Sequence, residues 1–220
     1  MKHSLEVDSI ILEFDIKRVL QDVYLQIETG KITGILGRNG CGKTCLMNII
    51  YGELEAHGKS IRMDGQAIFN GFRDPGTFRY LPQFSFIPKS LKINRIFKDF
   101  KLDFSQFIVE FPEFEKYYTV KLKRLSGGEQ RIIEVYSILA SKTRFCMLDE
   151  PFSHVMPVHV ETLKRILIHE KGNKGILITD HLYQHITDIS DDLYVLANGK
   201  TYLTKGLSDL RTFGYVHSAG

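Results

Sequence analysis

Apolar and polar side chains alternate with a period of two near the start of the chain. The stretches 4–14 and 19–27 follow this pattern, which predicts two β-strands. Short apolar runs at 31–36, 144–148 and 175–179 predict further strands. The pattern therefore predicts strands in both the N-terminal and the C-terminal halves of the chain.

Between these strands, apolar positions recur with helical spacing. The segments 45–51, 128–141 and 158–170 are expected to be helices, and Gly52 is expected to close the first of them. Strands that alternate with helices predict a mostly parallel sheet with helices on both faces. The expected fold class is therefore α/β.

Two turns predict antiparallel strand pairs in addition to the parallel strands. Asp64-Gly65 divides the stretch 60–69 into a hairpin, and Asn198-Gly199 turns the strand 192–197 into a last strand at 200–203. Together with the alternating stretches at the start of the chain, the first hairpin predicts an N-terminal antiparallel β part.

The segment 85–124 differs in composition from the rest of the chain because it is rich in Phe, Lys and Tyr. Two stretches within it, LKINRIFKDF and FSQFIVEF, have helical spacing, and Pro112 breaks the pattern directly after the second. We expect a helical insertion here, which with the next helix forms a helical subdomain of about 85–139. The remaining parts, 1–84 and 140–220, are expected to form the core of a single domain.

Composition excludes several classes of protein. With 220 residues, 43% of them hydrophobic and 25% charged, the chain is ordinary for a soluble globular protein. A net charge of +3 is too weak to indicate nucleic-acid binding, and no apolar stretch is long enough to span a membrane. The start of the chain lacks the apolar core of a signal peptide. The three cysteines have no metal-ligand spacing, so a reducing cytoplasm is the expected location.

A glycine-rich segment follows the predicted strand 31–36. It reads Gly37-Arg38-Asn39-Gly40-Cys41-Gly42-Lys43-Thr44 and matches the pattern of Gly, four residues and Gly-Lys-Ser/Thr. Its glycines allow backbone N–H groups to point at a polyphosphate, while Lys43 reaches the β/γ-phosphates and Thr44 ligates Mg²⁺. Strand, loop and helix N-terminus together form a phosphate site, and Cys45 begins the helix.

Cys41 within this segment has two interpretations. Its proximity to Lys43 predicts a thiol with a lowered pKa that is open to oxidation. The alternative is a small side chain that fills space where Ala or Ser would also serve.

An apolar strand ends in two carboxylates at Asp149 and Glu150. In P-loop enzymes such a strand lies beside the P-loop strand, and its terminal Asp supports Mg²⁺. Asp149 fits that role, and Glu150 is then placed to polarise a water aimed at the γ-phosphate. The alternative is a strand that simply ends in solvated acids.

A second glycine segment, Leu125-Ser126-Gly127-Gly128-Glu129-Gln130, precedes a predicted helix. Ser126 is a good N-cap, and Glu129 is its partner in a capping box. A helix N-terminus with free N–H groups also binds anions, so the structural and the ligand-binding interpretations are compatible.

In combination these motifs resemble those of the nucleotide-binding subunit of an ATP-binding cassette (ABC) ATPase, over nearly the full length of the chain. GRNGCGKT resembles the Walker A loop, MLDE the Walker B strand and LSGGEQ the signature motif. Gln83, in YLPQ, resembles the Q-loop glutamine that contacts Mg²⁺ and the attacking water. His181, in ITDH, resembles the switch histidine that touches the γ-phosphate, and Phe14 lies where an aromatic ring stacks on adenine. Taken alone, these three residues are an ordinary loop glutamine, a helix-start histidine and a core phenylalanine.

The resemblance implies an α/β P-loop NTPase (RecA-like) fold, ATP and Mg²⁺ as cofactors, and ATP hydrolysis coupled to transport. Glu150, His181 and Gln83 are the implied catalytic residues, and Thr44, Gln83 and Asp149 the implied metal ligands. In this family the residues matching Ser126 to Glu129 close over ATP held by a second nucleotide-binding subunit, so a homo- or heterodimer is expected.

A separate transmembrane permease subunit is also implied, and it would hold the chain on the inner face of the cell membrane. No nucleic-acid partner is expected. Two alternatives stay open: a non-transport cassette that acts as a mechanical switch, and a regulatory cassette that binds ATP but barely hydrolyses it. The transported substrate and the direction of transport are not determined by the sequence.

The sequence departs from the family after Glu150. The family usually reads Ser-Ala-Leu-Asp in this D-loop, whereas here Met156 replaces the Asp. This puts communication between the two ATP sites in doubt, but not ATP binding. The aromatic residues of 84–107 lie in the region that docks the membrane partner in the family, and they suit both a small core and a docking surface.

Overall fold

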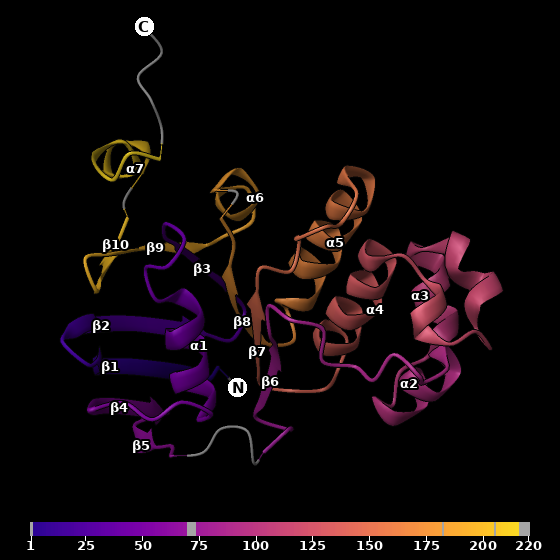
Figure 1. Ribbon diagram of the computed structural model, residues 1–220, viewed down its shortest axis with the longest axis horizontal. Coiled ribbons are helices and arrows are strands. Elements are labelled where there is room, and N and C mark those ends of the chain that lie inside the picture. Colours follow the sequence, from indigo (N-terminus) through magenta and orange to yellow (C-terminus); the bar gives the residue numbers. More distant parts are fainter. Residues whose placement is uncertain (1, 70–73, 182, 205, 216–220) are drawn as a thin grey trace, which may run out of the picture.

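Ten strands form one sheet in the computed structural model (Figure 1), in the order β5-β4-β1-β2-β10-β9-β3-β8-β7-β6. The structure describes residues 2–69, 74–181, 183–204 and 206–215, without the side chains of residues 207 and 208. No helix in these described ranges is long and apolar enough to cross a membrane.

One side of the sheet is antiparallel. β1 (Ser4–Phe14) pairs with β2 (Lys17–Glu28) and with β4 (Gly58–Met63), and β4 pairs with the short β5 (Gln66–Ala67). The predicted turn at Asp64-Gly65 is confirmed, since both residues have positive φ angles, 52° and 79°. Two positive φ angles in a row are typical of the tight turn that Asp-Gly favours in hairpins.

The other side of the sheet is mostly parallel, as predicted. β3 (Ile32–Leu36) lies between β8 (Gly175–Thr179) and β9 (Asp192–Ala197) and runs parallel to both. β7 (Phe145–Asp149) pairs with β8 and with the edge strand β6 (Phe78–Leu81). β10 (Lys200–Leu203) returns antiparallel to β9, as the Asn198-Gly199 turn predicts, and joins the two sides of the sheet through β2.

Helices cover both faces of this sheet. The three predicted helices form as α1 (Lys43–Tyr51), α4 (Gly127–Leu139) and α5 (Pro157–Glu170). Two short helices that the sequence did not predict follow later: α6 (Tyr183–Thr187) and α7 (Leu207–Thr212).

The predicted helical insertion lies at the opposite end of the molecule from the antiparallel strands (Figure 1). It contains α2 (Ile93–Asp99) and α3 (Phe104–Glu110), followed by 3-10 turns at Pro112–Tyr117 and Leu122–Arg124. The break predicted at Pro112 is confirmed, because α3 ends two residues before it and a 3-10 helix begins there.

Alternate side chains of the central strands belong to different apolar clusters. In β8, Leu177 packs in the cluster that contains the apolar side of α1, whereas Ile176 and Ile178 pack in the cluster that contains α4 and α5. This alternation places one cluster on each face of the sheet. The second cluster extends without interruption into the phenylalanines of the helical insertion, so the insertion shares the core of the sheet.

Candidate nucleotide site

The first glycine-rich segment connects the end of β3 to the start of α1, as predicted. Gly42 has a φ of 108°, and a Cβ added to it would lie 3.0 Å from Cγ1 of Val19, so a larger residue is both strained and crowded here. The Lys43 side chain is buried and folds back over the loop, where Nζ donates to the carbonyl oxygens of Gly37 at 2.7 Å and Arg38 at 3.4 Å. The loop therefore surrounds a buried cation at a helix N-terminus, an arrangement that attracts phosphate.

An open cleft of about 540 Å³ lies over this loop. Ten of its lining residues are sequence-predicted site residues: Phe14, Asn39, Gly40, Gly42, Lys43, Thr44, Cys45, Gln83, Glu150 and His181. Val19 of β2 is the remaining member and had not been predicted. Phe14 and Val19 come from β1 and β2, and the other lining residues lie at or just after the carboxyl ends of strands β3, β6, β7 and β8, where open α/β sheets bind their ligands.

Glu150 is the focus of polar contacts in the cleft. Its Oε2 atom accepts hydrogen bonds from Nε2 of Gln83 at 3.0 Å and Oγ of Ser153 at 3.3 Å. Nδ1 of His181 lies 3.6 Å from the same oxygen. The three residues predicted to be catalytic are therefore in one cluster, and Ser153 joins them.

The backbone of Glu150 is unusual because its φ angle is 48°, in the left-handed region, and Pro151 follows it. A residue other than Gly in this conformation costs about 1–3 kcal/mol, so other contacts must hold it. Its N–H donates to the carbonyl oxygen of Thr179 at 3.0 Å, and its own carbonyl oxygen accepts from Nη2 of Arg131 at 3.1 Å.

Asp149 lies below the cleft and is fully buried at the end of β7. Its Oδ1 atom accepts a short hydrogen bond from the hydroxyl of Thr179, and its Oδ2 atom lies 3.5 Å from the hydroxyl of Tyr80. Both carboxyl oxygens of Asp149 therefore have hydrogen-bond partners within the protein. The alternative of a strand that ends in solvated acids is wrong for Asp149.

The polar groups of the cleft are suited to Mg²⁺ shared with a phosphate ligand. Thr44 and Gln83 line the cleft and offer hydroxyl and amide oxygens, and Asp149, buried at the end of β7, offers a carboxylate; these are the ligand atoms that Mg²⁺ prefers. No group of three or more His, Cys, Asp or Glu side chains could hold a metal within the described ranges. A small set of oxygen donors such as Thr44, Gln83 and Asp149 fits a Mg²⁺ ion that takes most of its ligands from phosphate and water.

The thiol of Cys41 is not activated. Burial raises the pKa of Cys41, and the nearby Lys43 opposes this only in part. A Cβ on Gly37 would lie 2.4 Å from the sulfur of Cys41, so the Cys41 side chain fills the space beside Gly37 inside the loop. The prediction of a lowered pKa is wrong, and the space-filling alternative agrees with the structure. Burial also raises the pKa of Cys45.

The second glycine segment lies at the N-terminus of α4, and none of its residues, Leu125 to Gln130, lines the cleft. The predicted capping box is confirmed: Oγ of Ser126 accepts from the N–H of Glu129, and Oε2 of Glu129 accepts from the N–H of Ser126 at 2.7 Å. Burial alone would raise the pKa of Glu129, but hydrogen bonds from Ser126 and Tyr117 hold it below its usual value. Ser126 and Gly127 are exposed.

The D-loop residues lie beside this segment. A Cβ on Gly128 would lie only 2.5 Å from the carbonyl oxygen of His154, so the two backbones are in close contact. Met156 is 62% exposed and precedes the first residue of α5. The signature segment and the D-loop thus form one surface of the molecule.

Several contacting residues had not been singled out from the sequence. Arg131 and Glu134 are buried charges in α4. The sequence signal for them is the presence of two charged residues in an otherwise apolar stretch of helix.

Residues near the end of the described chain lie against the first glycine loop. A Cβ on Gly214 would lie 3.4 Å from Nη2 of Arg38 in that loop. Burial raises the pKa of the adjacent Tyr215 to about 12, with a smaller contribution from Cys41. No local pattern indicates this contact.

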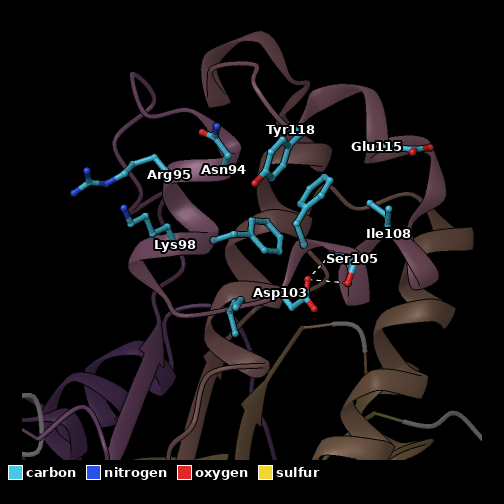
Figure 2. Close-up of a pocket in the computed structure, with 11 residues that line it drawn as sticks. Asn94, Arg95, Lys98, Asp103, Ser105, Ile108, Glu115 and Tyr118 are labelled. Carbon is cyan, nitrogen blue, oxygen red and sulfur yellow. Dashed lines mark hydrogen bonds between the residues drawn. The ribbon is translucent and has the colours of Figure 1, made fainter.

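A second cleft, of about 900 Å³, opens in the helical insertion (Figure 2). Arg95 and Lys98 of α2 lie on one side, and Ile108 and Glu115 lie on the opposite side. The aromatic residues of this region have mixed environments, as predicted: Phe97 and Phe107 are buried, whereas Phe84 is 69% exposed.

A glycine-rich loop between a strand and a helix, at the carboxyl edge of a parallel sheet, defines the chain as a P-loop NTPase. Residues 20–153 match the family model described as ABC transporter. The chain therefore belongs to the ABC transporter family, as the sequence motifs predicted.

Curated relatives cover most of the chain. The lipopolysaccharide export system ATP-binding protein LptB of Escherichia coli K12 is 30% identical over 198 residues, which cover 83% of this chain and 82% of the relative. The energy-coupling factor transporter ATP-binding protein EcfA1 of Thermotoga maritima is 31% identical over 209 residues, which cover 88% of this chain and 78% of the relative.

Solved structures share the fold. An ATP-binding subunit of an ABC transporter superimposes with a TM-score of 0.80 at 21% identity, over 96% of this chain and 93% of that one. A bacterial Atm1-family ABC exporter with ATP bound gives a TM-score of 0.83 at 18% identity, over 97% of this chain and 41% of the exporter.

Proposed function

We propose that the chain is the ATP-hydrolysing subunit of an ABC transporter and that Glu150 is its catalytic base. The observation that carries this proposal is the cluster of Gln83, Ser153 and His181 around one carboxylate, at the edge of a cleft that also contains Lys43 and Thr44. A carboxylate beside a phosphate site is placed to orient and polarise an attacking water.

The other residues of the cleft then hold the substrate. Lys43 and the N–H groups of the loop bind the phosphates, and Thr44, Asp149 and Gln83 hold Mg²⁺, which neutralises charge on the phosphates. His181 stabilises the γ-phosphate. Phe14, 49% exposed at the rim of the cleft, stacks on the adenine ring.

The working unit is a dimer, either of two copies or of this chain and a related subunit. This part of the proposal is supported by the exposure of Ser126 and Gly127. Both lie at the surface, but neither lines the nucleotide cleft of their own chain. A helix N-terminus with exposed N–H groups is suited to the γ-phosphate of ATP held by the other subunit.

A permease subunit is the second partner, and it holds the chain on the cytoplasmic side of the membrane. We assign its contact to the helical subdomain, about 85–139, where Phe84 is exposed beside it and the cleft of Figure 2 opens. The named relatives serve a lipopolysaccharide export system and an energy-coupling factor transporter, so they do not indicate one transported substrate.

Replacement of Glu150 by Gln tests the catalytic assignment. We expect turnover of Mg-ATP to fall by about 10²–10⁴-fold, the usual contribution of a general base, while ATP affinity is retained because the phosphate loop is unchanged. Phosphate release measures turnover, and a fluorescent ATP analogue measures affinity. Glu55→Gln is a matched control, since Glu55 is exposed and pairs only with Lys59 among the described residues. Unchanged turnover in Glu150→Gln would disprove the role of Glu150.

Affinity purification from solubilised membranes tests the transport role. A chain that works in a transporter is expected to retain a multi-spanning membrane protein, and Phe84→Asp is expected to weaken this association without changing ATP affinity. Lys59→Asp changes charge on the opposite, antiparallel side of the molecule and serves as the control. Recovery of soluble partners alone would favour the non-transport alternative.

A further inference from the structure

Helix α4 carries a buried ion pair that faces two segments of the candidate site. Arg131 and Glu134 are 6% and 1% exposed, and Nη1 of Arg131 lies 3.6 Å from Oε2 of Glu134. They lie about one and two turns after Gly127, the first residue of the helix. Buried charges are costly unless they are fully paired, so the partners of this pair indicate what it does.

The guanidinium group of Arg131 joins the two segments that carry catalytic residues. Nη1 donates to the carbonyl oxygen of Pro82 at 2.8 Å, immediately before Gln83. Nη2 donates to the carbonyl oxygens of Asp149 at 2.7 Å and Glu150 at 3.1 Å. One rigid, planar group therefore fixes the backbone on both sides of the Gln83–Glu150 contact.

Glu134 holds the other end of the Gln83 segment. Its Oε1 atom accepts from the hydroxyl of Ser85 at 2.6 Å and from the N–H groups of Phe86 at 3.2 Å and Ile87 at 3.4 Å. The residues before and after Gln83 are thus attached to α4, although both lie more than 40 residues away in the sequence.

We propose that Arg131, oriented by Glu134, is a positioning residue that makes the placement of Gln83 and Glu150 depend on the position of α4. Glu150 holds a left-handed backbone conformation, and Arg131 donates to its carbonyl oxygen, so a shift of the helix changes the direction of the Glu150 carboxylate. A ligand that binds at the N-terminus of α4 then acts on the base through this pair. The inference rests on the hydrolytic role proposed for Glu150.

The main test compares kcat with ATP affinity in Arg131→Met and Arg131→Lys. We expect Arg131→Met to lower kcat on the order of 10²-fold, as expected for a base misplaced by about 1 Å. The dissociation constant of a fluorescent ATP analogue is expected to stay near the wild-type value, because the phosphate loop keeps its contacts. Arg131→Lys is expected to recover part of kcat, since an ammonium can donate to some of these carbonyls without the planar fork.

Lys164→Met is the matched control for the loss of a buried cation. Lys164 lies in α5 and is 7% exposed, and its Nζ atom pairs with Oε1 of Glu161 at 3.1 Å and Oδ2 of Asp188 at 2.9 Å, neither of which lines the cleft. It is expected to lower stability but to keep the wild-type kcat per folded molecule. An equal loss of kcat in Lys164→Met, or a loss of ATP affinity in proportion to kcat in Arg131→Met, would overturn the positioning role.

Ser85→Ala decides the question if Arg131→Met does not fold. Ser85 is exposed, and its hydroxyl is one of the donors to Glu134, so the variant loosens the Gln83 segment at little cost to folding. We expect a several-fold loss of kcat with unchanged ATP affinity, and no effect of Ser90→Ala, an exposed serine five positions later. Wild-type kcat in Ser85→Ala would then reject the proposal. Absence of ATPase activity in the unmodified protein would instead reject the proposed function itself.

Discussion

Two adjacent glycines at the start of α4 have different surroundings. A Cβ on Gly128 would lie 2.5 Å from the carbonyl oxygen of His154, whereas a Cβ on Gly127 meets no described atom within 4 Å. The signature segment thus needs its second glycine for packing against the D-loop. Its first glycine is free of that requirement, because no described residue excludes a side chain at that position.

This difference predicts opposite effects on stability. Gly128→Ala forces two backbone segments apart, and we expect it to lower the free energy of unfolding by about 1–3 kcal/mol, as for an overpacked core. Gly127→Ala is expected to leave it unchanged or to raise it by up to about 1 kcal/mol, because Ala favours a helix over Gly. Urea unfolding, with the slope compared between variants, measures both values. Equal stability of the two variants would contradict the close contact with His154.

At the level of elements, the sequence predicted those that have a strong period or a turn signature. β1 and β2 alternate over ten or more residues, and α4 has both a capping box and an apolar face. α6 and α7 have five and six residues, too few for a helical period to be distinguished. The sequence therefore predicted the helices that have a clear period and missed these two short ones.

The sequence motifs predicted most residues of the candidate site, but they did not predict the contacts that hold those residues in place. The loop 37–44, Gln83, Glu150 and His181 lie in recognisable local patterns, and the structure places lining residues from all of them around one cleft. The contacts of Arg131 join residues that are 49 and 18 positions away, and no period or spacing encodes such a distance. The only sequence signal for these contacts is that Arg131 is a charged residue in an apolar stretch of α4, where a buried charge needs hydrogen-bond partners.

At the scale of the whole molecule, the two glycine segments lie on different surfaces. The first lines the cleft, together with Phe14 and His181, whereas Ser126 and Gly127 are exposed outside it. Arg131 connects these surfaces through the interior, because its helix begins at the second segment and its guanidinium holds the backbone of Glu150. Under the proposed function, the N-terminus of α4 in a second subunit covers the cleft of the first, and each subunit makes the same contact.

This arrangement predicts dimerisation that depends on ATP. Glu150→Gln prevents loss of ATP by hydrolysis, so with saturating Mg-ATP we expect this variant to form a dimer, measured by size-exclusion chromatography with light scattering. Adding Lys43→Ala removes the cation that holds the phosphates, and this double variant is expected to stay monomeric at the same ATP concentration. Adding Gly127→Asp to Glu150→Gln places a negative charge at the helix N-terminus that would meet the γ-phosphate, and it is expected to abolish the dimer while ATP affinity for the monomer is kept. A dimer that survives Gly127→Asp would place the interface elsewhere on the molecule, and a dimer that forms without ATP would show that the nucleotide is not part of it.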